Sequence, residues 1–140
     1  MIKKLTFTIF TIFFLFNNAN AKSKYFEEGI ILYNDNKLED AKFKFEQDIL
    51  FNPKSELSYL YLSKIFNKQE KKDLEERNLN TVMLINPKNE EAIYYLAKLK
   101  LTASDYQKSK ELLKKLKLVC SNYCNKSSKL KIEIENLSKK

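Results

Sequence analysis

The sequence of 140 residues contains no histidine and no tryptophan, and it has a single glycine and a single arginine. The lack of histidine excludes histidine acid–base catalysis and histidine ligation of a metal. Lysine, asparagine, isoleucine and phenylalanine are abundant, which is the composition that an AT-rich genome produces without any selection for binding. Most of the lysines are therefore not, by themselves, evidence for an anionic partner.

The chain has no apolar run long enough to span a membrane. Residues 5–16 are apolar, whereas a spanning helix needs about 20 such residues. Lys3 and Lys4 precede this run and Ala19-Asn20-Ala21 follows it, which is the pattern of a secretory signal peptide. We expect residues 1–21 to be a cleaved signal peptide, with an uncleaved anchor as the alternative. No cysteine directly follows Ala21, which argues against a lipoprotein, and export to a bacterial periplasm or beyond is expected.

The formal charge is +8 and falls to +6 without Lys3 and Lys4. Residues 108–140 hold ten lysines against three glutamates, whereas residues 22–107 are nearly neutral. Because export separates the protein from nucleic acid, no nucleic-acid partner is expected. Weak contact between the basic C-terminal end and an anionic envelope surface fits this charge better.

Two stretches of the chain repeat with a spacing of 34 residues. Pro53 and Pro87 each follow an asparagine, and Tyr25 and Tyr59 have the same separation as the prolines. Apolar periodicity and Asn-Pro stop signals predict helices over 23–33, 38–51, 55–67 and 71–85. A third, more degenerate unit predicts helices over 90–101 and 105–119, and a last amphipathic helix is expected over 127–138.

This pattern resembles the tetratricopeptide repeat (TPR) family, whose unit is a helix–turn–helix of this length. The resemblance implies an all-α, right-handed solenoid with units near 22–55, 56–89 and 90–123, and with residues 127–140 as a capping helix and basic tail. It also implies which residues pack the repeats together. These are Tyr25, Gly29, Leu32, Ala41, Phe45, Pro53, Tyr59, Leu62, Phe66, Leu79, Pro87, Leu96 and Ala97.

The first helix of each unit should line an inner groove that binds a peptide or a helix. Tyrosines dominate the expected lining, and tyrosine is common in binding hot spots; their packing between neighbouring units is the alternative. Some family members clamp a terminal carboxylate with Lys, Asn and Arg, but those places here hold Phe26, Ile30, Tyr61, Glu91 and Tyr95. The candidate groove residues are Phe26, Tyr33, Asn34, Tyr61, Lys64, Lys68, Tyr94, Tyr95 and Lys98.

Cys120 and Cys124 are the only cysteines. An oxidising compartment favours a structural disulfide between them, with free thiols as the alternative. The pair lacks the C-x-x-C spacing of thiol oxidoreductases, and two cysteines without histidine make a poor metal site. We expect no metal and no cofactor.

The sequence therefore predicts a non-enzymatic scaffold or adaptor that binds a protein or peptide in the cell envelope. The first alternative is a structural subunit of an envelope assembly that docks through its outer face or its C-terminal helix. A thiol oxidoreductase that uses Cys120 and Cys124 is the remote alternative. No catalytic residues can be nominated, and no transmembrane anchor is expected after cleavage.

Overall fold

The computed structural model describes residues 23–138, and all regular structure in this range is helical. The expected signal peptide lies outside the described residues. Six helices begin and end within one residue of the predicted positions, but the last begins three residues earlier than expected. The helices are α2 (Lys24–Asn34), α3 (Leu38–Phe51), α4 (Glu56–Lys68), α5 (Lys72–Ile85), α6 (Glu90–Thr102), α7 (Tyr106–Val119) and α8 (Cys124–Leu137).

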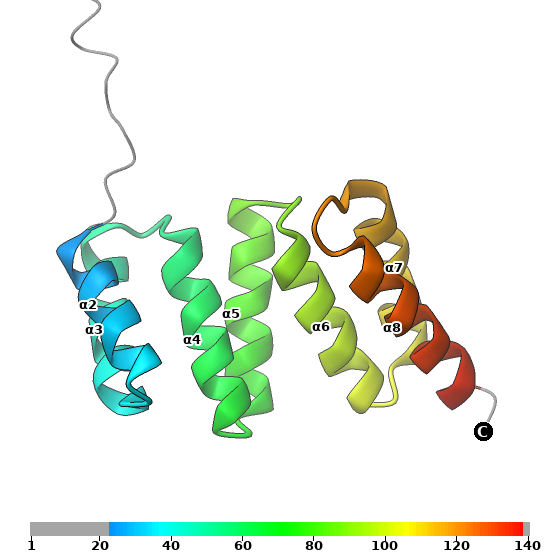
Figure 1. The fold of residues 1–140 in the computed structure, drawn as a ribbon, viewed down its shortest axis with the longest axis horizontal. Helices are drawn as coiled ribbons and strands as arrows, with labels where there is room; N and C mark the ends of the chain where they lie inside the picture. The colour runs from blue at the N-terminus through cyan, green and yellow to red at the C-terminus, as the bar shows by residue number, and fades with distance from the viewer. Residues whose placement is uncertain (1–22, 139–140) are drawn as a thin grey trace, which may run out of the picture.

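The helices form a two-layered solenoid of antiparallel pairs (Figure 1). In the view of Figure 1, α2, α4 and α6 lie in front, and their partners α3, α5 and α7 lie behind. The helix α8 follows α6 in the front layer and covers the end of the stack. The turns after α3, α5 and α7 lie along the upper edge, and the turns within each pair lie along the lower edge. No helix within residues 23–138 has the length and apolar character to cross a bilayer.

Side-chain caps define several helix starts. Ser23, Asn89 and Asp105 each accept a hydrogen bond from a backbone N–H in the first turn of α2, α6 and α7. The buried carboxylate of Asp48, near the end of α3, accepts hydrogen bonds from the hydroxyls of Ser23, Ser55 and Ser58. These contacts join the start of α2 and the start of α4 to the same residue and so link the first two units.

The turn within each helix pair has the same backbone conformation. Asn36, Glu70 and Ser104 lie 34 residues apart, and their φ angles are 59°, 58° and 61°. After each, a backbone N–H bonds back to the helix, as from Asp105 to the carbonyl of Lys100 at 2.9 Å. This is a Schellman ending, which glycine makes most easily. The chain makes it three times without glycine.

Replacing Ser104 by glycine should stabilise the protein. Glycine adopts a positive φ without steric cost, so Ser104→Gly should raise the free energy of unfolding by about 1 kcal/mol and Tm by about 4 °C. The neighbouring Ala103, with a φ of −82°, provides the matched control. Ala103→Gly should lower the free energy of unfolding by about 0.5 kcal/mol. Thermal melts of both variants by circular dichroism test this, and a loss of stability in Ser104→Gly would contradict it.

The core consists of two clusters of buried side chains. One surrounds Phe45 between the first and second units, and the other surrounds Leu79, Ile93 and Leu116 and extends to Ile134 of α8. In the first unit Gly29 faces the ring of Phe45, and a Cβ atom at Gly29 would lie 2.7 Å from its Cε1. The close approach of α2 and α3 therefore depends on the glycine.

Three of the expected packing residues do not fill the space between repeats. Tyr25 is half-buried, and it stacks at 5.4 Å on Phe51, which is 72% exposed. Ile93, its equivalent in the third unit, shares a core cluster with Leu60 and Leu79 of the preceding unit, whereas no unit precedes Tyr25 among the described residues. Pro53 and Pro87 are exposed in the turns after α3 and α5, so they stop these helices but fill no space between repeats.

Candidate functional site: a tyrosine-lined groove

Two adjoining clefts lie on the face formed by the first helices of the units. The larger, of about 530 Å³, is lined from Asn67 to Thr102, and the smaller, of about 330 Å³, is lined from Tyr33 to Tyr95. Asn67, Glu75 and Tyr95 line both, so the clefts form one continuous depression, which we call the groove. It runs across α2, α4 and α6, with α5 supplying part of its floor.

Aromatic rings from α2 and α4 form the N-terminal half of the groove. The ring of Tyr61 stacks on Phe45 at 5.1 Å and meets the edge of Tyr33 at 5.2 Å. The Nζ atom of Lys64 lies 4.5 Å from the Tyr61 ring centroid, and that of Lys68 lies 4.4 Å from the Tyr33 centroid. These cation–π contacts hold positive charge directly over the aromatic lining. The groove therefore presents apolar surface and cations together.

Tyr95 of α6 stands at the junction of the two clefts. Its ring meets that of Tyr94 at 5.4 Å, and burial raises the pKa of its hydroxyl, with a further contribution from the charge of Glu91. Because the hydroxyl stays neutral, it can both donate and accept hydrogen bonds. Glu91 is itself paired with Lys64 at 2.9 Å, which ties α6 to α4 across the groove. Tyr95 can therefore supply both ring contact and hydrogen bonding to a ligand.

Glu75 is a buried carboxylate in the floor of the groove. Only 4% of its surface is exposed, and the amide of Asn67 donates to both of its oxygens at 3.1 Å. Burial raises the pKa of Glu75, and the Asn67 hydrogen bond and the Lys72 charge oppose this shift. The residues at the equivalent positions of the other units are the small Ala41 and Ser109. A carboxylate at a position where the other units have a small residue was the sequence signal for Glu75 as a groove residue, and it was missed.

Replacing Glu75 by glutamine should stabilise the protein at neutral and higher pH. A carboxyl group whose pKa is raised by folding favours the folded state below its unfolded pKa and loses that contribution as pH rises through the folded pKa. Glu75→Gln removes the charged form, so its Tm should exceed the wild-type Tm at pH 8, and the difference should shrink towards about pH 4. Thermal melts across this range measure it, with the exposed Glu46→Gln as control. A difference that grows as pH falls would contradict the assignment.

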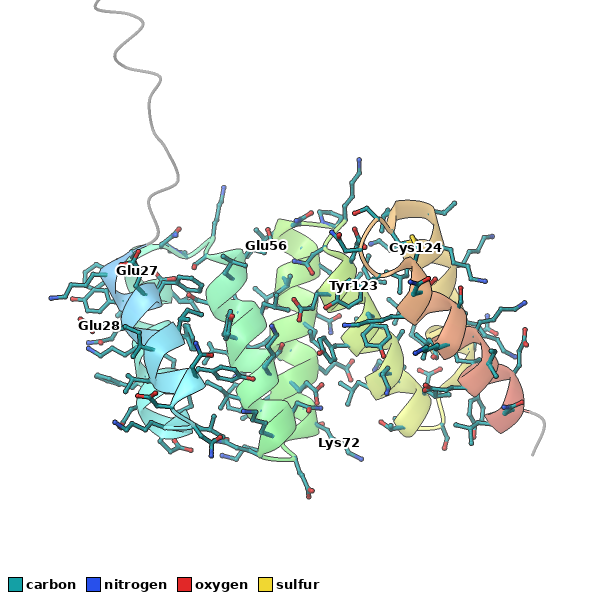
Figure 2. The ribbon with its side chains drawn as sticks, in the orientation of Figure 1. Glu27, Glu28, Glu56, Lys72, Tyr123 and Cys124 are labelled. Atoms are coloured by element: carbon teal, nitrogen blue, oxygen red, sulfur yellow. A yellow bond between two sulfur atoms is a disulfide. The ribbon has the colours of Figure 1, made fainter. Side chains whose placement is uncertain are left out.

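The C-terminal end of the groove face is closed by the chain itself. The ring of Tyr123, labelled in Figure 2, lies 5.5 Å from that of Tyr94, and the Nζ atom of Lys126 lies 4.1 Å from the Tyr123 centroid. Burial, followed by the charge of Glu91, raises the pKa of Tyr123. Lys98 lies 3.9 Å from Glu133 of α8. The open part of the groove therefore extends from Tyr33 to Lys98.

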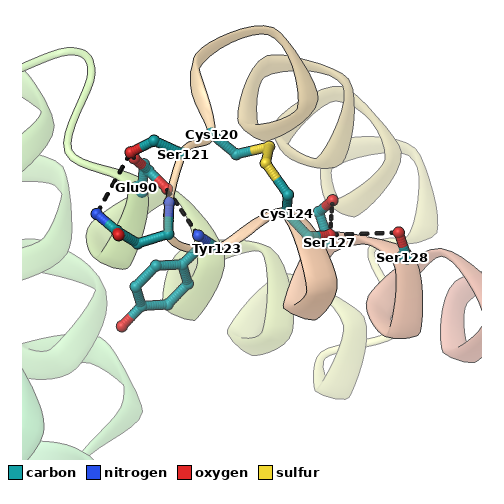
Figure 3. The surroundings of a disulfide bond; sticks show 8 residues. Glu90, Cys120, Ser121, Tyr123, Cys124, Ser127 and Ser128 are labelled. Atoms are coloured by element: carbon teal, nitrogen blue, oxygen red, sulfur yellow. Dashed lines mark hydrogen bonds between the residues drawn. A yellow bond between two sulfur atoms is a disulfide. The ribbon is translucent and has the colours of Figure 1, made fainter.

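A disulfide and one carboxylate hold this closing segment in place (Figure 3). Cys120 caps the end of α7 and is bonded to Cys124, the first residue of α8, with 5.3 Å between their Cα atoms. Glu90 of α6 accepts hydrogen bonds from the Ser121 hydroxyl at 2.7 Å and from the Tyr123 backbone N–H at 2.8 Å. These bonds, the Ser121 contact foremost, lower the pKa of Glu90. The cysteines thus occupy a structural position between two helices.

The structure separates the predicted groove residues into two sets. Tyr33, Tyr61, Lys64, Lys68, Tyr95 and Lys98 line the groove. Phe26 was misplaced, because it is only 4% exposed and packs against Phe45 and Tyr61. Asn34 is exposed at the end of α2 and lines neither cleft, and Tyr94 is covered by Tyr123 and Lys126. Within residues 23–138 no three potential metal ligands from His, Cys, Asp and Glu gather into a site.

Solved structures show that the fold is that of TPR domains. The Yersinia enterocolitica type III secretion chaperone SycD, in complex with a peptide of the translocator YopD, matches with a TM-score of 0.73 and 14% identity over 82% of this chain and 90% of that one. The first TPR domain of Spaghetti (RPAP3), bound to the HSP90 peptide SRMEEVD, matches with a TM-score of 0.72 and 12% identity over 81% and 90%. The TPR2B domain of yeast Sti1, in a complex with pHsp70, matches with a TM-score of 0.73 and 14% identity over 81% and 98%.

No protein-family model matches the sequence, and no curated protein matches it either. The likeness to these chaperone and adaptor domains is therefore one of fold.

Proposed function

We propose that this protein is a non-enzymatic adaptor of the bacterial cell envelope that binds a peptide or helix in its groove. The observation that carries the proposal is the open, continuous groove between Tyr33 and Lys98, with aromatic rings and lysines on its surface. Three domains of the same fold have peptide or chaperone ligands, which supports binding of an extended or helical segment. The charged and polar residues of the groove indicate which side chains the bound segment has.

The lining favours a ligand that is apolar with some acidic residues. Lys64 and Lys68 lie over tyrosine rings, so an acidic side chain of the ligand meets a cation while an adjacent apolar side chain meets the aromatic surface. Glu75 and Asn67 at the floor of the groove form a polar site whose oxygen atoms can accept a hydrogen bond from the ligand. Together these contacts specify a short amphipathic segment with acidic residues at its margins.

Site-specific photocrosslinking in cells tests this proposal. A photoreactive phenylalanine analogue in place of Lys98, which lines the groove, should form a covalent adduct with an envelope protein. The same analogue in place of the exposed Asn80, on α5 in the rear layer, is the control and should not form that adduct. Mass spectrometry then identifies the captured segment. Adducts at Asn80 and none at Lys98 would favour the alternative in which the protein docks through its outer face.

The envelope location is part of the proposal, and the expected signal peptide supports it. Lys3, Lys4, the apolar run and Ala19-Asn20-Ala21 predict a mature chain that begins at Lys22. Mass spectrometry of the protein from its native envelope should find Lys22 as the N-terminal residue. A dominant species that retains Met1 would contradict export by cleavage.

A further inference from the structure

Three leucines occupy the same exposed place in the three units. Leu50, Leu84 and Leu118 are 34 residues apart, and each lies in the last turn of the second helix of its pair. Their exposed fractions are 73%, 83% and 79%. Each helix already contributes buried residues to the core, including Phe45, Leu79 and Leu113 at matching positions. Packing of the repeats therefore does not require the exposed leucines.

These leucines lie along one edge of the solenoid. The turns after α3, α5 and α7 form the upper edge in Figure 1, and Figure 2 shows Glu56 near that edge and Lys72 near the opposite one. Phe51, beside Leu50, is 72% exposed and extends the apolar surface. The turns at the lower edge, residues 35–37, 69–71 and 103–105, contain no exposed large hydrophobic residue. We call the surface formed by Leu50, Phe51, Leu84 and Leu118 the leucine edge.

The charges beside the leucine edge are positive. Lys54 and Lys88 follow the exposed leucines in the sequences LFNPK and LINPK, and Lys117 precedes Leu118. Within residues 23–138 none of these three lysines forms a salt bridge. The next acids along the chain, Glu56 and Glu90, accept hydrogen bonds from neighbouring turns. The lower-edge turns instead carry both signs, with Asp35, Lys37, Glu70, Lys71 and Asp105.

We propose that the leucine edge binds the surface of an anionic phospholipid bilayer. Apolar side chains that enter the interface, flanked by lysines that meet anionic headgroups, are the two components of peripheral membrane binding. Each leucine has the same place in its repeat, so a surface that lies along the edge meets all three together. The groove lies on the front helices and stays open to a ligand while the edge contacts lipid. This inference is independent of what the groove binds.

Single tryptophans test the proposal, because the chain contains none of its own. Leu50→Trp, Leu84→Trp and Leu118→Trp should each shift their emission to shorter wavelengths when full-length protein meets vesicles that contain phosphatidylglycerol. Brominated acyl chains should quench the same emission. Ile31→Trp and Ile132→Trp are the controls, since these isoleucines are 62% and 58% exposed but lie away from the edge. The controls keep the test valid even if another segment tethers the chain to the vesicle.

Charge variants test the identity of the surface. In the Leu84→Trp protein, the measured quantity is the lipid concentration that gives half of the emission shift. Lys54→Gln with Lys88→Gln should raise this concentration by about fivefold for each lysine replaced. Lys37→Gln with Lys71→Gln, at the lower edge, should leave it unchanged. Vesicles of pure phosphatidylcholine should give little shift.

Four results would overturn the proposal. They are the absence of a shift at all three leucine positions, equal shifts at the control positions, and equal binding to neutral and anionic vesicles. The fourth is a dimer in analytical ultracentrifugation that Leu84→Ser dissociates, because a second copy of the chain would then cover the edge.

Discussion

Replacing Gly29 by leucine is expected to lower the free energy of unfolding by about 3 kcal/mol or more. The Cβ atom alone would approach the Phe45 ring to 2.7 Å, and the rest of the leucine would have to enter the same space. Phe45 is fully buried between the rings of Phe26 and Tyr61 and cannot move aside without displacing both. Overpacking of a filled core commonly costs about 1–3 kcal/mol, and a collision with an immobile ring lies at the upper end.

Urea unfolding followed by circular dichroism measures this effect. The matched control is Glu27→Leu, which places the same side chain on the exposed face of α2 and should change the midpoint little. Gly29→Ala should fall between the two, because it adds only the first colliding atom. A wild-type midpoint for Gly29→Leu would show that α2 and α3 do not pack in the proposed register.

Truncation of Tyr95 is expected to weaken ligand binding by about thirtyfold. Tyr95 lines both clefts of the groove, and a buried aromatic anchor commonly contributes about 2 kcal/mol to a complex. Tyr61 is a poorer test residue, because its ring contacts Phe45 and its truncation would also disturb the core. Calorimetric titration of Tyr95→Ala with the segment captured by crosslinking measures the effect.

Two variants separate binding from folding. Tyr95→Phe keeps the ring and should retain most of the affinity, losing only what the hydroxyl contributes. Tyr106→Ala truncates another half-buried tyrosine, on α7 and outside the groove, and should bind like the wild type. Wild-type affinity in Tyr95→Ala would exclude this part of the groove as the binding site. If Tyr95→Ala unfolds while Tyr95→Phe and Tyr106→Ala stay folded, the ring of Tyr95 belongs to the hydrophobic core.

The helices could be predicted because their signals are local. Apolar periodicity, Asn-Pro stops and the 34-residue register placed six helices to within one residue of their ends. The family resemblance implied the packing role of Gly29, and the cost of a glycine inside a helix fits a position where two helices approach closely. The start of α8 was missed, because the helix begins at the disulfide-bonded Cys124, three residues before the apolar periodicity indicated.

Errors arose where the environment of a residue depends on distant parts of the chain. Tyr25 and Phe26 are adjacent aromatic residues, and periodicity alone gave Tyr25 the buried face. In the structure Phe26 contacts Tyr61 of the second unit and is buried, whereas Tyr25 stacks on the exposed Phe51 of its own unit. The closure of the groove by Tyr123 likewise depends on Glu90, 33 residues away in the sequence. No local sequence pattern predicts such a contact.

The most direct test of the central claim is a map of where the ligand binds. Isotope-labelled protein is titrated with the captured segment, and backbone amide shifts are followed by NMR. The largest changes should occur on α2, α4 and α6 around Tyr33, Asn67, Tyr95 and Lys98. The outer helices α3 and α7 should change little. Changes that concentrate on α3, α7 or α8 while the groove residues stay fixed would contradict the account.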